Sequence, residues 1–439
     1  MRSASFGQFR AVLGRSGANS FPISDNTREA HSARLCEKET WPPWRRRRVF
    51  IKRRRKVVKR TTWLFQFLMM LGSVAIPAHA ELGIETVTTQ ERLPTAHPYR
   101  LYYTDVALPH LPDGKLVIID GRSMKVEGMV STGSFAQTTV SPDRSEIYVA
   151  TTYYAKLNRG QRFEEILVYD ASTLALKAEI PYPARHSQSL PYLATLRTSA
   201  DGRFIYVQNA SPATSIGIVD RQLGKMVNEI QTPGCFGLYP AQNALRVATL
   251  CGDGTMLTIS LNDDGMATDK QKSPEFFDPT DDALFVAPAQ DGDLYYFPSF
   301  KGDIVTVNVG GEVAKPTDRW SMASASEKRR GWRPSGFQPI ALHVDSGTLY
   351  AGVHSKGYEG SHKDPMQEIW VFDVKTKKRV ARSKTPAAFG LAVSKGAAPR
   401  LFAYNTEHSS IIAFDGLRKL KKVAEKAGFG DTPSQLETQ

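Results

Sequence analysis

The residues best suited to chemistry in this chain are a group of histidines and carboxylates toward its C-terminus. Imidazole nitrogens and carboxylate oxygens are common ligands of transition metals. The group comprises His343, His354, His362, Asp364 and Glu368. Its spacings match neither a zinc finger nor an H-E-x-x-H helix, and alternation along a strand would let His343 and His354 face different ways. We therefore interpret these residues as surface or turn residues and predict no metal site.

Other motifs that support catalysis without a partner are missing from the sequence. It has no G-x-S-x-G nucleophile elbow, no phosphate-binding loop and no dinucleotide-binding glycine motif in a fitting context. Gly252-Asp253-Gly254 has the composition of a turn. We predict that this chain, taken alone, has no catalytic residue and binds no cofactor.

Three cysteines are present, and Cys36 precedes the segment interpreted below as an export signal. The other two, Cys235 and Cys251, are an even number suited to an oxidising compartment. A disulfide closing a loop of this length contributes about 3 kcal/mol in the chain-entropy model. A redox-active pair usually has C-x-x-C spacing, which is absent here, so we predict a structural disulfide.

The elements that must position these residues repeat along the chain. Seven short apolar runs, most of them closing on Asp, recur at steps of 41 to 65 residues. They end at Asp120, Asp170, Asp220, Leu261, Asn308, Asp373 and Asp415. Each run has an upstream companion rich in β-branched and aromatic residues, and most companions follow a turn rich in Pro, Asp, Gly or Ser. A strand-only repeat of this length predicts an all-β fold, a seven-bladed β-propeller.

Two further interpretations follow from the repeat. No stretch between the runs has the 3.6-residue periodicity of a crossover helix, so we set aside an α/β fold. The repeated Asp is interpreted as a turn-former rather than a metal ligand, because radial blades hold the seven copies apart.

Residues 417–427 (LRKLKKVAEKA) look helical, and we predict a short C-terminal helical appendage there.

All of the excess positive charge lies in the leader. The chain of 439 residues has a net charge of +13, and residues 1–80 hold 17 of its 57 basic residues but only 4 of its 44 acidic residues. The remainder is balanced, so the charge is no evidence for a nucleic-acid partner. An Arg-rich run, a 14-residue mostly apolar stretch and Ala78-His79-Ala80 form the pattern of a cleavable export signal.

These features predict a periplasmic protein with four segments. The apolar stretch is short for a membrane span, which makes an uncleaved anchor the minor alternative. Arg47-Arg48 resembles a twin-arginine signal, but its distance from the apolar stretch leaves both export routes open. The segments are a poorly defined extension (1–44), the export signal (45–80), the propeller (81–416) and a C-terminal tail (417–439).

The longest step of the repeat, from Asn308 to Asp373, is the least repeat-like part of the chain. Long propeller insertions form loops on one rim, and exposed Trp, Arg and Phe are frequent anchors at protein interfaces. We therefore predict that Trp332, Arg333 and Phe337 contact a partner protein. The alternative is a larger blade whose Trp covers its own edge.

The same step carries a family resemblance. The chain resembles the heavy subunit of the quinoprotein amine dehydrogenases, which act on methylamine and on aromatic amines. The resemblance is carried by GWRPSGFQ at 331–338, His362-Lys363 and EIWVFD at 368–373. NASPATSIGIVD at 209–220 adds to it and leans toward the aromatic-amine branch. The similarity runs from about residue 97 to about residue 415, and the family has its heavy-subunit disulfide where Cys235 and Cys251 lie.

The resemblance implies a function that depends on a second chain. It implies a periplasmic propeller that assembles with a light subunit into an α2β2 enzyme, in which the light subunit carries tryptophan tryptophylquinone and the catalytic Asp. The implied reaction is oxidative deamination of a primary amine to aldehyde and ammonia, with electrons passed to a blue-copper protein of the amicyanin or azurin kind. Family heavy subunits contribute one Phe to the substrate channel, and Phe135 in STGSF at 131–135 matches that motif. The departure lies after Asp415, where the sequence is short, Lys-rich and unlike the usual closing strand.

Two other classes of function are alternatives for a periplasmic propeller. One is a binding or scaffold protein without redox chemistry. The other is a lactonase-like hydrolase, which would need acidic metal ligands that converge on the axis, and the sequence offers no such set.

Overall fold

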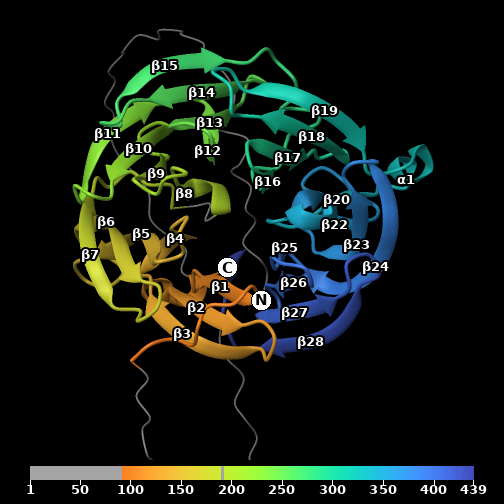
Figure 1. Cartoon of the computed structure of the whole chain (residues 1–439), viewed down its shortest axis with the longest axis horizontal. Coiled ribbons are helices and arrows are strands. Elements are labelled where there is room, and N and C mark those ends of the chain that lie inside the picture. The colour runs from red at the N-terminus through yellow and green to blue at the C-terminus, as the bar shows by residue number, and fades with distance from the viewer. Residues whose placement is uncertain (1–90, 189–191) are drawn as a thin grey trace, which may run out of the picture. The chain divides into compact units, whose positions relative to one another are not determined.

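The computed structural model describes residues 91–188 and 192–439, so the predicted extension (1–44) and export signal (45–80) lie outside the described residues. In the described part, seven antiparallel sheets surround one axis, as Figure 1 shows. The predicted seven-bladed β-propeller is therefore confirmed. Every run that ends at a marker position forms the third strand of its blade, counted outward from the axis.

The first three blades use the N-terminal half of the described chain and one strand from the C-terminus. Blade one contains β29 (Pro433–Thr438), β1 (Arg100–Asp105), β2 (Lys115–Asp120) and β3 (Lys125–Ser131). Blade two contains β4 (Ser134–Val140), β5 (Glu146–Tyr154), β6 (Arg162–Asp170) and β7 (Leu176–Tyr182). Blade three contains β8 (Leu196–Thr198), β9 (Phe204–Asn209), β10 (Ser215–Asp220) and β11 (Lys225–Gln231).

The other four blades follow in chain order. Blade four contains β12 (Cys235–Pro240), β13 (Arg246–Cys251), β14 (Met256–Leu261) and β15 (Ala267–Lys272). Blade five contains β16 (Ala289–Asp291), β17 (Leu294–Pro298), β18 (Asp303–Asn308) and β19 (Lys315–Ser321). Blade six contains β20 (Arg333–Pro334), β21 (Ile340–His343), β22 (Thr348–His354), β23 (Met366–Asp373) and β24 (Lys378–Ala388). Blade seven contains β25 (Gly390–Val393), β26 (Arg400–Asn405), β27 (Ser410–Asp415) and β28 (Lys421–Ala427).

Helices are few and short in the described residues. The α-helix α1 (Ala325–Arg329) lies outside the ring of blades in Figure 1, in the long step of the repeat. It begins with a capping box between Ser324 and Glu327, a local signal that sequence analysis missed. The 3-10 turns are η1 (Leu108–Asp113), η2 (Leu193–Thr195), η3 (Val344–Ser346) and η4 (Ser361–Lys363). Across 91–188 and 192–439, no helix is long and apolar enough to cross a membrane.

Burial falls from the middle strands to the outer edge of each blade. The four central residues of β2 are buried, whereas all six residues of β15 are exposed. Middle strands are covered on both faces by neighbouring blades, so they need apolar residues on both sides. Outer strands face water along one edge, and their lysines oppose pairing with another sheet. The core is accordingly divided among the junctions between blades, as where Tyr148 and Val168 meet Ile205 and Val219.

Four of the five Asp markers act as turn-formers, as predicted, whereas Asp415 pairs with Arg400. Asp120 Oδ1 accepts the backbone N–H of Arg122 at 2.9 Å, and Asp170 Oδ1 accepts that of Ser172 at 2.9 Å. Partial burial alone would raise the pKa of Asp120, but hydrogen bonds from Arg122 and Ser123 lower it to about 2. Because hydrogen bonds from the turns lower their pKa, the carboxylates of Asp120 and Asp170 stay ionised at neutral pH.

The prediction of a C-terminal helix was wrong. Residues 421–427 form β28, which pairs antiparallel with β27. Apolar residues at helical spacing suggested a helix, but the free edge of β27 offers backbone hydrogen bonds, and this pairing overrides local propensity.

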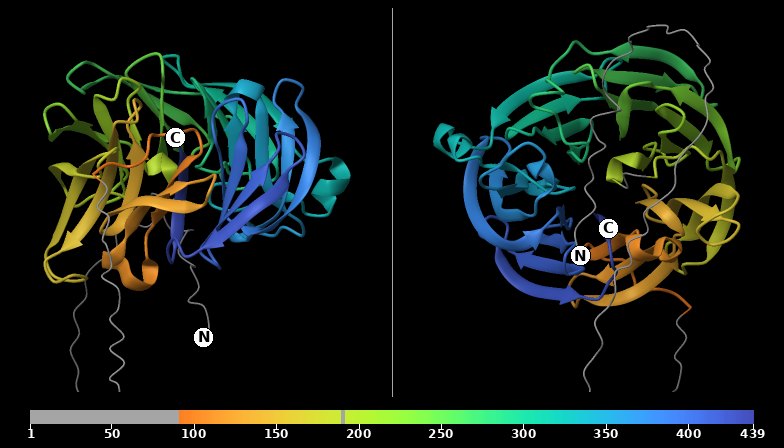
Figure 2. Two further views of the ribbon diagram at one scale, coloured as in Figure 1. Left: turned by 60° about the horizontal axis from the view of Figure 1, so that its bottom comes forward. Right: turned by 180° about the vertical axis from the view of Figure 1, so that it is seen from behind.

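The predicted C-terminal tail (417–439) is also part of the propeller. Beyond β28, β29 pairs with β1, with Leu436 opposite Tyr103. Figures 1 and 2 show the C-terminus beside the first strands. Blade one is therefore completed by both ends of the folded chain, which supplies the closing strand that the sequence did not reveal.

Candidate functional site

The propeller has two rims that differ in their residues. We call one of them the turn rim. There, each marker Asp at the end of a third strand lies opposite the first residue of the second strand. Asp120 thus lies opposite Arg100, and Asp170 lies opposite Glu146. The other, which we call the loop rim, is where the second strand of each blade ends. Those strand ends are Asp105, Tyr154, Asn209, Cys251, Pro298, His354 and Asn405.

Phe135, the predicted channel residue, lies on the loop rim near the start of β4, the innermost strand of blade two. It is half-buried and has a φ of 56°, in the left-handed region. The β4–β5 register shifts at this point, since Ser134 lies opposite Thr152 and regular pairing resumes at Gln137 opposite Ala150. A left-handed conformation costs a residue with a Cβ about 1–2 kcal/mol. Such bulges re-aim side chains, so Phe135 departs from the regular in–out alternation of its strand.

A buried contact between Glu164 and His186 lies further from the axis on the same rim. The side chains of Glu164 and His186 are each 1% exposed, and Glu164 Oε2 lies 2.9 Å from His186 Nδ1. Glu164 also accepts the backbone N–H groups of Arg185 at 2.8 Å and His186 at 3.0 Å. Burial alone would raise the pKa of Glu164, but its hydrogen bonds with His186 and Arg162 hold it below the ordinary value. The group fixes the chain that follows β7. Sequence analysis missed it because no local pattern links residues 22 positions apart.

Trp332 is partly engaged by its own blade. Its ring centroid lies 5.3 Å from that of Trp370, and the guanidinium carbon of Arg382 lies 5.1 Å from the Trp332 ring centroid. Arg382 pairs in turn with Glu327 at 3.1 Å and Glu368 at 2.8 Å. The ring is half-buried, so it covers the edge of blade six and also keeps exposed surface.

Phe337 lies close to the axis. Its ring stacks on Phe389 with centroids 6.0 Å apart and lies 6.4 Å from the ring of Tyr192. Phe389 directly precedes β25, the innermost strand of blade seven, and its backbone N–H donates to the carbonyl of Tyr404 near the loop-rim end of β26. The structure thus brings Phe337 to the same rim as Phe135.

Arg333 reaches this rim from the neighbouring part of the long step. It begins β20 and lies opposite His354, the last residue of β22. Its guanidinium carbon is 4.6 Å from the ring centroid of Phe300, a residue of blade five. Phe135, Arg333 and Phe337 are therefore located at the loop rim, whereas the ring of Trp332 packs on the middle of β23 and on β24.

The histidines and carboxylates of the long step do not form one group, although the charge of Asp364 acts on both His354 and His362. His343 lies at the turn rim, where its ring nitrogens contact Ser346 Oγ at 2.8 Å and the carbonyl of Gly396 at 2.9 Å. His354 ends at the opposite rim, and Glu368 pairs with Arg382. In the part of the chain that the structure describes, no three His, Cys, Asp or Glu side chains are grouped to hold a metal ion.

Cys235 and Cys251 form a disulfide, as predicted. They lie directly opposite each other on β12 and β13 of blade four. Because Cys251 ends β13, the bond joins the two inner strands at the loop rim. It therefore supports the inner part of the rim that carries Phe135 and Phe337.

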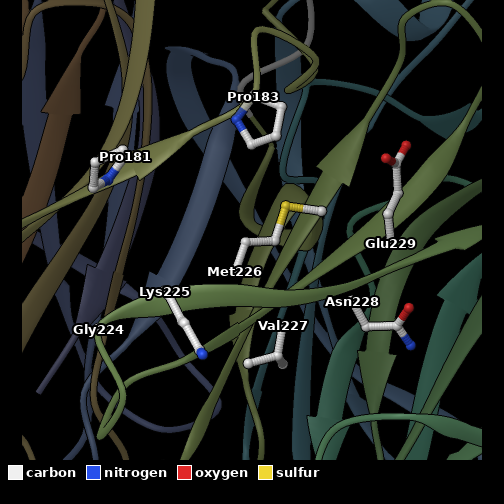
Figure 3. Close-up of a pocket in the computed structure, with 8 residues that line it drawn as sticks. All are labelled: Pro181, Pro183, Gly224, Lys225, Met226, Val227, Asn228 and Glu229. Carbon is white, nitrogen blue, oxygen red and sulfur yellow. The ribbon is translucent and has the colours of Figure 1, made fainter.

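A surface groove lies between β7 and β11, the outer strands of blades two and three (Figure 3). It is lined by Pro181, Pro183, Gly224, Lys225, Met226, Val227, Asn228 and Glu229. Lys225 and Glu229 extend in different directions in Figure 3, and the remaining lining is largely apolar. The groove has no convergent polar groups suited to catalysis.

Comparison with known proteins gives one consistent family. Residues 98–438 match the sequence model described as "Methylamine dehydrogenase heavy chain (MADH)". The chain is 26% identical over 349 residues to the methylamine dehydrogenase heavy chain of Methylophilus methylotrophus, covering 78% of this chain and 84% of that protein. It is 25% identical over 344 residues to the heavy chain of Methylobacillus flagellatus, covering 76% and 83%.

Solved structures support the fold alone. A putative 6-phosphogluconolactonase from Bacteroides uniformis has a TM-score of 0.55 at 13% identity, covering 80% of this chain and 100% of that one. A dihydro-heme d1 dehydrogenase has a TM-score of 0.52 at 14% identity, covering 80% and 78%. The family match, by contrast, spans every blade of the propeller. The chain belongs to the methylamine dehydrogenase heavy chain family.

Proposed function

We propose that this chain is the heavy subunit of a periplasmic amine dehydrogenase whose tryptophan tryptophylquinone cofactor is held by a light subunit in an α2β2 assembly. The observation that carries the proposal is the family match over residues 98–438. The absence of a self-contained catalytic motif in the sequence is consistent with chemistry located on a partner.

The proposed reaction converts a primary amine and water into an aldehyde, ammonia and two protons, with the release of two electrons. When bound in the light subunit, the quinone supplies the electron acceptor for this step, and a blue-copper protein takes the electrons onward. The part played by this chain is to hold the light subunit and to shape the route by which the amine enters.

Phe135 is the residue proposed to shape that route. It lies on an innermost strand at the loop rim, and its left-handed backbone moves the side chain out of the strand's regular alternation. An aromatic side chain at a channel selects by size and shape, and one methylene in an apolar pocket changes discrimination by about 10- to 200-fold. Phe135 would therefore influence which amines are accepted without taking part in proton or electron transfer.

The light subunit is proposed to dock on the loop rim. Arg333 and Phe337 lie there, Trp332 directly precedes Arg333, and all three are half-buried, so they keep surface for a partner. Residues of these types supply much of the binding energy at protein interfaces.

The proposal is tested by expressing this chain with and without a light subunit of the same family. The expected result is a coloured complex in the periplasmic fraction that reduces a dye in the presence of an amine, whereas the chain alone does not. A chain that purifies alone, binds no light subunit and gives no amine-dependent dye reduction would instead be a scaffold or binding propeller. Strong amine oxidation by the isolated chain would also contradict the proposal.

A further inference from the structure

Arg333 is a half-buried cation that has no carboxylate partner among the residues that the structure describes. Its Nε atom is buried and makes no hydrogen bond. Two other half-buried arginines of the loop rim have acidic partners. These pairs are Arg162 with Glu164 and Arg185 with Glu229. Arg333 differs from these two half-buried arginines in lacking an anion.

The Arg333 side chain is nevertheless held in one place. Its guanidinium lies over the ring of Phe300, with the central carbon 4.6 Å from the ring centroid. Its stem crosses the backbone of Gly357, where an added Cβ would lie only 2.3 Å from Cδ and Nε of Arg333. Any side chain at position 357 would therefore displace the arginine. A guanidinium fixed in this way loses little conformational entropy when it binds an anion.

Charges nearby do not neutralise Arg333. Residues 355–364 contain two lysines, one glutamate and one aspartate, so their formal charges cancel. Burial lowers the pKa of His354, and the charge of Arg333 lowers it further, against the opposing effect of Asp364. The lowered pKa of His354 keeps a second positive charge away from Arg333, and the neutral imidazole supplies no anion.

The surroundings of Arg333 are aromatic. The ring of His362 meets those of Phe285 and Phe300 edge-on, with centroids 6.3 and 6.1 Å apart. Tyr358, the neighbour of Gly357 in sequence, is 59% exposed. We call Phe285, Phe300, Arg333, Tyr358 and His362 the arginine–aromatic patch. Arg and aromatic residues are enriched at the desolvated centres of interfaces, and charged residues there require a partner of opposite sign.

We infer that Arg333 receives a carboxylate from an Asp or Glu side chain of the light subunit when the two subunits assemble. The inference rests on the proposed function and specifies the chemistry of its interface. A carboxylate is the natural ligand, because its two oxygens match the planar fork of a guanidinium. The contact also accounts for an arginine that is held in position without an anion of its own.

The test compares three variants of this chain in binding to the purified light subunit. Arg333→Gln should raise the dissociation constant by about 10- to 100-fold, mainly through faster dissociation. Arg333→Lys should show a smaller loss, since it keeps the charge but not the paired hydrogen bonds. Arg329→Gln is the matched control, because it removes one charge from an exposed position of the same insertion, and its dissociation constant should stay within about 2-fold.

Three results separate the possible failures. A wild-type chain that does not bind the light subunit refutes the proposed function, and the inference falls with it. Wild-type binding with equal effects of Arg333→Gln and Arg329→Gln overturns the inference while leaving the proposed function intact. A double-mutant cycle against each Asp and Glu of the light subunit should reveal one coupled residue, and a cycle with no coupling also overturns it. Thermal unfolding of each variant shows that a weaker affinity does not come from misfolding.

Discussion

Leu436 tests whether the last strand closes the ring. Its side chain is fully buried, at 0% exposure, in the core between blades seven and one, together with Leu101, Tyr103 and Phe402. Truncating a buried Leu to Ala removes transfer free energy and leaves a cavity, at a cost of about 2–5 kcal/mol. Leu436 is packed by residues from two blades, so the site has little freedom to collapse. We expect Leu436→Ala to lower the free energy of unfolding by about 3 kcal/mol.

The assay is urea unfolding followed by tryptophan fluorescence. A loss of about 3 kcal/mol corresponds to a midpoint lower by about 1 M at an m-value of about 3 kcal/mol/M, with the m-value itself unchanged. The matched control is Leu223→Ala, since Leu223 is 60% exposed in a turn and should change stability by less than about 0.5 kcal/mol. If both variants unfold at the same midpoint, residues 433–438 are a dispensable tail and the closure argument is wrong.

Three other predictions concern the loop rim. Replacing both Cys235 and Cys251 by Ser should cost about 3 kcal/mol of unfolding free energy, and a reducing agent should lower the stability of the wild type to that of the variant; a wild type insensitive to reduction would contradict this. The pKa of Glu164 is lower in the folded chain than its ordinary value of about 4.3, so its stabilising effect is present above that value and is lost as pH falls through the folded pKa. The stability difference between the wild type and Glu164→Gln should therefore shrink below about pH 5 in urea titrations, and a constant difference would show that the charge of Glu164 does not stabilise the fold. In the assembled enzyme, Phe135→Ala should change the ratio of kcat/KM for bulky and small amines by about 10-fold or more while subunit assembly is unaffected, and an unchanged ratio would remove Phe135 from the channel.

The blade number was predictable because each blade repeats the same burial problem. The third strand of each blade is covered on both faces and therefore needs an unbroken apolar run, and the turn after it favours Asp. The same pattern therefore recurs in successive blades. The disulfide was also predictable, since only two cysteines follow the leader. Outer strands were harder to predict from the sequence. Nearly all of β28 is exposed, so no buried face requires alternating apolar residues, and its sequence resembled that of a helix.

Local sequence therefore contained the repeated strands, the turn chemistry, the cysteine pair and the residue types of the insertion, because each depends on neighbours a few positions away or on composition. The arrangement around the axis depended on contacts between distant residues. Pairing of β29 with β1 joins positions more than 300 apart, and the buried contact of Glu164 with His186 joins β6 to the chain that follows β7. The same holds for Arg333, whose lack of an acidic partner becomes visible only when Phe300 and Gly357 are placed beside it. A carboxylate can approach from any part of a folded chain, so the absence of one is a property of the tertiary structure.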